Sequence, residues 1–79
     1  MKIKLLAFGI AREIFGASSI EIELPGNTVA DLKFSLEALY PKLKALASYL
    51  VAVNNEYAAG DLVLDIRDEV AIIPPVSGG

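Results

Sequence analysis

The sequence has 79 residues, a net charge of −3 and no cysteine or histidine, while 54% of its residues are hydrophobic. A chain of this length is expected to form one domain, because it buries only about 60 to 65% of its unfolded surface. The composition excludes disulfides, histidine-containing metal sites and the common catalytic triads. The lack of cysteine predicts a cytoplasmic location. The acidic balance, with only seven basic residues, predicts that nucleic acid is not a partner.

The chain is also expected to be soluble and to have no membrane partner. No apolar run approaches the roughly 18 to 20 residues that cross a bilayer. The first eight residues superficially resemble a signal peptide, but Lys4 interrupts their apolar pattern and no small-residue cleavage site follows. We therefore interpret the start of the chain as a strand of the domain.

Two half-buried strands are predicted at the start. Apolar and charged residues alternate in residues 2–7 and again in residues 20–24, which is the period of a strand with one buried face. If these strands pair antiparallel, the lysines of the first and the glutamates of the second share the outward face, where opposite charges favour the register. Residues 11–16 between them, which end in Gly16, predict a short helical turn.

One substantial helix is predicted next, after the turn at residues 25–27. Thr28 and Asp31 have the spacing of a capping box. The apolar stripe that follows is made by Val29, Leu32, Leu36 and Leu39. Pro41 ends the helix, because it lacks a donor and pushes the preceding residue out of helical geometry. Residues 42–49 predict a looser helical turn.

Three further strands are expected in the second half of the chain. Residues 50–53 are apolar, and Asn54-Asn55 tolerate the positive φ of a tight turn, so a hairpin is expected through Tyr57. A brief strand at residues 62–64 precedes residues 69–73, which are apolar on both faces as in a central strand.

This order of elements predicts an α+β fold, namely a β-grasp or ubiquitin-like roll. Its mixed sheet has one main helix packed on one face, with the first and last strands parallel at the centre. The β-grasp domain is expected over residues 1–73. Leu6 and Phe8 point to the uncovered face, and an uncovered apolar face marks a partner. The alternatives are that they are scattered surface hydrophobes or that residues 42–49 cover them.

Side-chain chemistry has little support in this sequence. The serines have no histidine to act as base, and there is no thiol nucleophile. Asp65, Asp68 and Glu69 are interpreted as solvated charges of a surface turn and not as ligands of a cation. No glycine-rich nucleotide motif occurs. We therefore expect neither a bound cofactor nor a bound metal.

The end of the chain, residues 74–79, remains as the site of chemistry. Pro74 and Pro75 stop the last strand and favour an extended conformation, so these residues are expected to form a semi-rigid tail. Gly78 and Gly79 have no Cβ, so the tail could thread a narrow channel. The alternative is an ordinary frayed end. The pattern predicts that the carboxylate of Gly79 carries the chemistry.

Over essentially its whole length, the chain resembles the small subunit of molybdopterin synthase, a family of ubiquitin-like sulfur carriers. The matching segments are Ala11-Arg12-Glu13 before Gly16, Val51-Ala52-Val53-Asn54, and Asp68-Glu69-Val70-Ala71-Ile72-Ile73-Pro74-Pro75-Val76-Ser77-Gly78-Gly79. The last segment is very specific. The chain departs from the family at Arg67, where the family usually has glycine.

The resemblance implies a division of labour between this chain and two partners. A ubiquitin-activating-like adenylyltransferase would consume ATP to adenylate Gly79, and sulfur would then replace one oxygen to give a thiocarboxylate. The large subunit of molybdopterin synthase would supply the catalytic side chains and accept the tail. The chain alone would have no activity. With Gly79 as the catalytic residue, the expected partner-binding residues are Leu6, Phe8, Pro74, Pro75, Val76, Ser77 and Gly78.

Two related functions stay open. A sulfur carrier for thiazole biosynthesis would use the same terminal chemistry, although the residues before Gly78 look more like the molybdopterin branch. A ubiquitin-like protein modifier would join Gly79 to a lysine of a target. An interaction module without terminal chemistry gives no reason for a bare Gly-Gly end.

Overall fold

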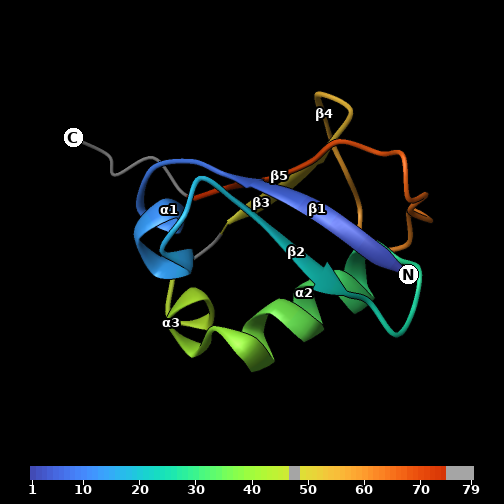
Figure 1. The fold of residues 1–79 in the computed structure, drawn as a ribbon. Helices are drawn as coiled ribbons and strands as arrows, with labels where there is room; N and C mark the ends of the chain where they lie inside the picture. The colour runs from blue at the N-terminus through green and yellow to red at the C-terminus, as the bar shows by residue number, and fades with distance from the viewer. Residues whose placement is uncertain (47–48, 75–79) are drawn as a thin grey trace.

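The computed structural model describes residues 1–46 and 49–74, and Figure 1 shows how their helices and strands are arranged. The elements are β1 (Lys2–Ala7), α1 (Ile10–Phe15), β2 (Ser19–Glu23), α2 (Val29–Leu39), α3 (Pro41–Lys44), β3 (Leu50–Val53), β4 (Glu56–Tyr57) and β5 (Val70–Ile73). No helix within the described residues has the length and apolar character needed to span a membrane.

The five strands form one mixed sheet in the order β2-β1-β5-β3-β4. The neighbours β1 and β5 are parallel, and the other neighbouring pairs are antiparallel. The helical layer lies on one side of this sheet, with α2 and α3 below it in Figure 1. A mixed sheet with one main helix on one face is the β-grasp, or ubiquitin-like roll, so the predicted fold is confirmed.

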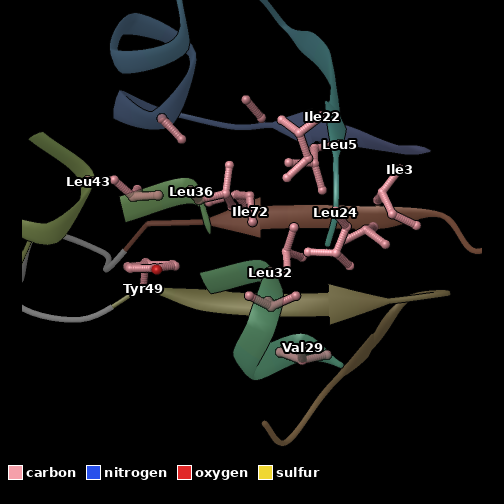
Figure 2. Close-up of a cluster of buried hydrophobic side chains, with 14 of the residues drawn as sticks. Ile3, Leu5, Ile22, Leu24, Val29, Leu32, Leu36, Leu43, Tyr49 and Ile72 are labelled. Carbon is pink, nitrogen blue, oxygen red and sulfur yellow. The ribbon is translucent and has the colours of Figure 1, made fainter. Parts of the chain in front are cut away.

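The core lies between the sheet and α2, as Figure 2 shows. The inward side chains of β1, among them Ile3 and Leu5, are fully buried, while the intervening lysines are exposed. Those lysines stand opposite the glutamates of β2, as predicted. On α2, the core side chains are Val29, Leu32 and Leu36.

Two helical predictions need correction. Leu39 was expected in the apolar stripe of α2, but its side chain is 62% exposed. The helix ends at that residue, and the buried side chain that follows is Leu43 of α3. Within the described part of residues 42–49, the predicted helical turn belongs to α3, which ends at Lys44. Residues 47–48 lie outside the described part of the chain.

The strand predicted at residues 62–64 is wrong. Only Val63 forms a bridge, and its partner is Thr28 in the connection before α2. The N–H of Leu64 donates to the carbonyl of Asn27 at 2.6 Å. This connection turns into the helix at once, so it offers no extended edge along which a strand could pair. Leu64 is nevertheless buried, which accounts for the apolar pattern.

The predicted capping box starts α2. The hydroxyl oxygen of Thr28 accepts from the backbone N–H of Asp31 at 3.2 Å, and Oδ2 of Asp31 accepts from the backbone N–H of Thr28 at 3.2 Å and of Asn27 at 3.1 Å. The hydrogen bonds from Thr28 are the main reason that the pKa of Asp31 lies below its ordinary value of 3.8. The charged carboxylate therefore stabilises the folded state more than the unfolded state.

We expect Asp31→Ala to lower the melting temperature at pH 7. Because the pKa of Asp31 is lower in the folded state, its stabilisation is present above the unfolded-state pKa and is lost as pH falls through the folded-state pKa. The difference in melting temperature between the wild type and Asp31→Ala should therefore narrow below about pH 4. Thermal melts of both proteins from pH 7 to pH 2 measure this difference, and a gap that stays constant would contradict it.

Candidate functional site

The face of the sheet opposite the helices is divided into a charged half and an apolar half. Lys2 and Lys4 lie toward the start of β1. Further along, the strand pairing places one row of side chains across four strands, namely Leu6, Ala71, Ala52 and Tyr57. Phe8 follows at the end of β1, and its side chain is 50% exposed. The apolar half therefore lies toward the carboxyl ends of β1 and β5.

A hollow of about 230 Å³ occupies this apolar half. Ala52 is only 6% exposed although it points away from the main core, so it forms the floor of the hollow. Tyr57 is 70% exposed and stands at its β4 side. The residues that line the hollow are Leu6, Phe8, Ala52, Asn55, Tyr57, Glu69, Ala71 and Ile73. We call this set the open-face hollow.

The structure brings together the two residues of the β-grasp domain that the sequence predicted to bind a partner. Leu6 and Phe8 both line the open-face hollow. The alternative that residues 42–49 cover them is not supported by the described part of that segment, because Leu43 of α3 is buried in the core on the helical side of the sheet. Their role in binding a partner stays a prediction.

Sequence reasoning missed the other half of the hollow, above all Tyr57. The signal was available, because a two-residue turn at Asn54 and Asn55 fixes which residues stand opposite each other in the hairpin. Both asparagines have positive φ, 53° and 70°, and the register places Tyr57 opposite Ala52. The apolar outward positions of β5, Ala71 and Ile73, were implied by the prediction of a strand apolar on both faces.

The predicted tail starts at the same end of the sheet as the hollow. Pro74 follows Ile73, the last residue of β5, without a break. It also lies beside the turn between β1 and α1, where a Cβ on Gly9 would be 3.2 Å from Cγ of Pro74. The predicted site residues Pro75, Val76, Ser77, Gly78 and Gly79 lie outside the described residues. The domain boundary predicted at residue 73 stays a prediction.

The charged turn before β5 accommodates Arg67 without strain. Arg67 has no positive φ, so glycine is not required at this position. Oδ1 of Asp65 accepts from the backbone N–H of Arg67 at 2.8 Å and from its Nε at 3.1 Å. The backbone hydrogen bond from Arg67 is the largest cause that lowers the pKa of Asp65. The ion pair is exposed, and such pairs contribute little stability.

The carboxylate of Asp68 also accepts hydrogen bonds, one from the same turn and one from Asn54. The backbone N–H of Asp65 donates to Oδ2 of Asp68 at 2.8 Å, and Nδ2 of Asn54 donates to Oδ1 of Asp68 at 3.0 Å. Within residues 1–46 and 49–74, no group of three or more acidic side chains is arranged to hold a metal ion. The carboxylates of this turn therefore have structural partners.

The fold defines this chain as a ubiquitin-like β-grasp protein, with the open-face hollow beside the start of its C-terminal segment. The sequence profile of the ThiS family matches residues 5–79. The chain belongs to the ThiS family.

Relatives of known name are similar over the whole chain. A molybdopterin synthase sulfur carrier subunit of Dictyostelium discoideum is 41% identical, with 99% of this chain and 96% of the relative covered. A protein of the same name from Arabidopsis thaliana is 38% identical, with 100% and 84% covered. These relatives carry the name that the sequence resemblance implied.

Solved structures confirm the fold. A putative molybdopterin converting factor subunit 1 of Pyrococcus furiosus has a TM-score of 0.85 and 32% identity, covering 96% of this chain and 99% of its own. Small archaeal modifier protein 1 of Methanosarcina acetivorans has a TM-score of 0.81 and 27% identity, covering 99% and 96%. A chain from the complex of subunits 1 and 2 of molybdopterin-converting factor from Helicobacter pylori has a TM-score of 0.69 and 22% identity, covering 100% of this chain and 100% of its own.

Proposed function

We propose that this chain is a sulfur carrier in molybdenum cofactor biosynthesis, namely the small subunit of a molybdopterin synthase. The observation that carries the proposal is the similarity to molybdopterin synthase sulfur carrier subunits, among them the Dictyostelium discoideum protein, which is 41% identical over almost the full length of both chains. The open-face hollow and the position of Pro74 are consistent with a carrier that presents its C-terminal residues to a partner.

The chemistry is placed on the carboxylate of Gly79. A carboxylate is a poor acyl donor, so an adenylyltransferase first joins it to AMP with release of pyrophosphate from ATP. Hydrosulfide from a sulfur donor then displaces AMP, which leaves with one of the carboxylate oxygens, and the product is a thiocarboxylate. This sulfur is the nucleophile that a cysteine would otherwise supply. ATP is consumed on the activating enzyme, and this chain itself binds no cofactor.

The large subunit is the partner for the open-face hollow. The strand β5 contributes Ala71 and Ile73 to the hollow and continues directly into Pro74. A partner that docks on the hollow therefore also lies at the start of the segment that leads to Gly79. A protein of the same fold from Helicobacter pylori was solved in a complex of subunits 1 and 2 of molybdopterin-converting factor. The cytoplasmic location stays a prediction.

The test of the proposal is a mass measurement. Incubation with the activating enzyme, ATP and a sulfur donor should increase the intact mass by one exchange of oxygen for sulfur. Fragmentation should locate the exchange on Gly79. A mass shift located on any other residue, or no shift with an activating enzyme that is active on a known carrier, would contradict the proposed function.

Phe8→Ala should weaken the complex with the large subunit by about 1 to 3 kcal/mol, because a half-exposed ring that a partner buries acts as an anchor. Its melting temperature should change little, since the ring is already 50% exposed in the free chain. Isothermal titration with the large subunit measures the affinity. Phe34→Ala is the matched control, because Phe34 is 80% exposed on α2, on the other side of the sheet. Equal affinities for both variants would mean that Phe8 is not an anchor.

A second function has one observation in its favour. The similarity to small archaeal modifier protein 1 extends over nearly the whole chain, so a role as a protein modifier, with Gly79 joined to a lysine of a target, is the competing proposal. Immunoprecipitation of the tagged chain from its host and digestion with trypsin, which cleaves last after Arg67, followed by a search for the remnant of residues 68–79 on lysines of other proteins, separates the two. Such remnants would establish conjugation, and their absence beside an abundant thiocarboxylate would favour the carrier.

A further inference from the structure

The tip of the β3–β4 hairpin is fastened to the start of β5 by Asn54. The backbone N–H of Asn54 donates to the carbonyl of Glu69 at 2.8 Å. The backbone N–H of Glu69 donates in return to the side-chain Oδ1 of Asn54 at 3.0 Å. The side-chain Nδ2 of Asn54 donates to Oδ1 of Asp68 at 3.0 Å. One residue therefore makes three hydrogen bonds to two successive residues of the neighbouring segment.

The side-chain oxygen of Asn54 accepts a hydrogen bond that a backbone carbonyl accepts in a regular antiparallel pair. In a regular antiparallel pair, two opposite residues exchange both N–H···O bonds, so the N–H of Glu69 would bond to the backbone carbonyl of Asn54. Asn54 instead has φ 53°, because it begins the two-residue turn. The side-chain Oδ1 accepts this hydrogen bond. Asparagine is suited to the position, since it tolerates positive φ and carries both an acceptor and a donor.

This connection fixes one wall of the open-face hollow. Tyr57 and Asn55, which line the hollow, belong to the hairpin, and Glu69 and Ala71 line it from the segment at β5. The strand β4 has only two residues and pairs with β3 alone. On the side of β5, the hydrogen bonds of Asn54 join the hairpin tip to this segment. The ladder between β3 and β5 sets the spacing along the strands, and the hydrogen bonds of Asn54 extend this connection to the hairpin tip.

We propose that Asn54 is a positioning residue for partner binding: it holds Tyr57 and Asn55 at the distance from β5 that the docked large subunit requires. Asn54 itself does not line the hollow, so it acts through the residues that do. The proposal rests on the proposed function, because it assumes that the large subunit binds at the open-face hollow.

An exchange of side chains tests the proposal. Asn54→Asp keeps an acceptor for the N–H of Glu69 but sets a second carboxylate against that of Asp68, so like charges meet at pH 7. The double variant Asn54→Asp with Asp68→Asn restores a donor and an acceptor. The new amide can donate to the new carboxylate and still accept from the N–H of Asp65. We expect the single variant to weaken binding of the large subunit about tenfold and the double variant to bind within about twofold of the wild type.

Gly16→Ala controls for a loss of stability that has nothing to do with the hollow. Gly16 ends α1 with φ 77°, so alanine there is strained, and nothing lies within 4 Å of the added Cβ. This variant should melt at a lower temperature and bind the large subunit like the wild type. If Asn54→Asp binds like the wild type, or if the double variant binds no better than the single one, the proposal is overturned.

Hydrogen exchange of the free chain separates this proposal from the proposed function. Because repulsion from Asp68 should move the carboxylate of Asn54→Asp away from the N–H of Glu69, the amide of Glu69 should exchange faster in this variant than in the wild type. It should return to the slower rate in the double variant. Equal exchange rates in all three proteins would overturn the role of Asn54 in bracing the hairpin. The exchange rates of the three proteins could differ as expected while the wild-type chain binds no large subunit. That result would contradict the proposed function, and with it the link between Asn54 and binding.

Discussion

Deletion of Gly79 is expected to abolish sulfur transfer and leave the melting temperature unchanged. The shortened chain still ends in a glycine carboxylate, but that carboxylate lies one residue, about 3.3 to 3.6 Å, short of the reacting centre. A displacement of about 1 Å can already cost a factor of about 10² in rate. We therefore expect at least a hundredfold loss of thiocarboxylate formation. The described core runs from Ile3 to Ile72, so the deletion removes no core side chain.

Two measurements make this prediction decisive. Intact mass after incubation with the activating enzyme, ATP and a sulfur donor reports the thiocarboxylate, and thermal melting reports the fold. Addition of one glycine after Gly79 is the matched control for length, because it preserves the chemistry of the terminus and displaces the carboxylate in the opposite direction. Normal thiocarboxylate formation by the shortened chain would contradict a terminus that must reach a fixed reacting centre.

Gly78→Val is expected to separate activity from stability. A valine adds a β-branched side chain to a segment that must enter the active sites of both partners. Forcing extra methyl groups into a fitted space costs about 1 to 3 kcal/mol, and each 1.4 kcal/mol is a factor of about ten in rate. We therefore expect thiocarboxylate formation and sulfur transfer to the pterin precursor to fall by about 10- to 100-fold. The melting temperature should not change.

Gly78→Ala provides the graded control for this prediction. Alanine adds a single methyl group, so its effect on both rates should be smaller than that of valine. Rates are measured with the activating enzyme and with the large subunit in separate assays, so that the active site of each partner is tested by itself. If Gly78→Val keeps normal rates in both assays, the threaded-tail mechanism has to be abandoned, even if the mass exchange at Gly79 is found.

Local sequence patterns correctly predicted the features that a few neighbouring residues specify. The capping box of Thr28 and Asp31 marks the start of α2, and Pro41 marks its end. The alternation of apolar and charged residues gives the faces of β1 and β2. Asn54-Asn55 gives the hairpin turn. Each of these signals acts over a few neighbouring residues, so the chain itself contains the information.

Sequence patterns failed where a neighbouring segment of the folded chain decides the local structure. Leu62 to Leu64 have the composition of a strand, but the neighbouring segment around Thr28 allows only one bridge. Leu39 continues the helical period of α2 but is exposed, because the helix ends there. Arg67 stands where the resembling family usually has glycine, and only the hydrogen bonds to Asp65 show why no positive φ is needed.

The sequence by itself determined the β-grasp fold, the outward direction of Leu6 and Phe8, and the resemblance that the family match bears out. Only the tertiary structure decided what surrounds those two side chains. Tyr57 and Ala71 are distant from them in the chain and reach the same hollow through the pairing of four strands. The bracing of that hollow by Asn54 depends on the contact with Asp68 and Glu69. Contacts between segments far apart in sequence arise from packing, which no local pattern specifies.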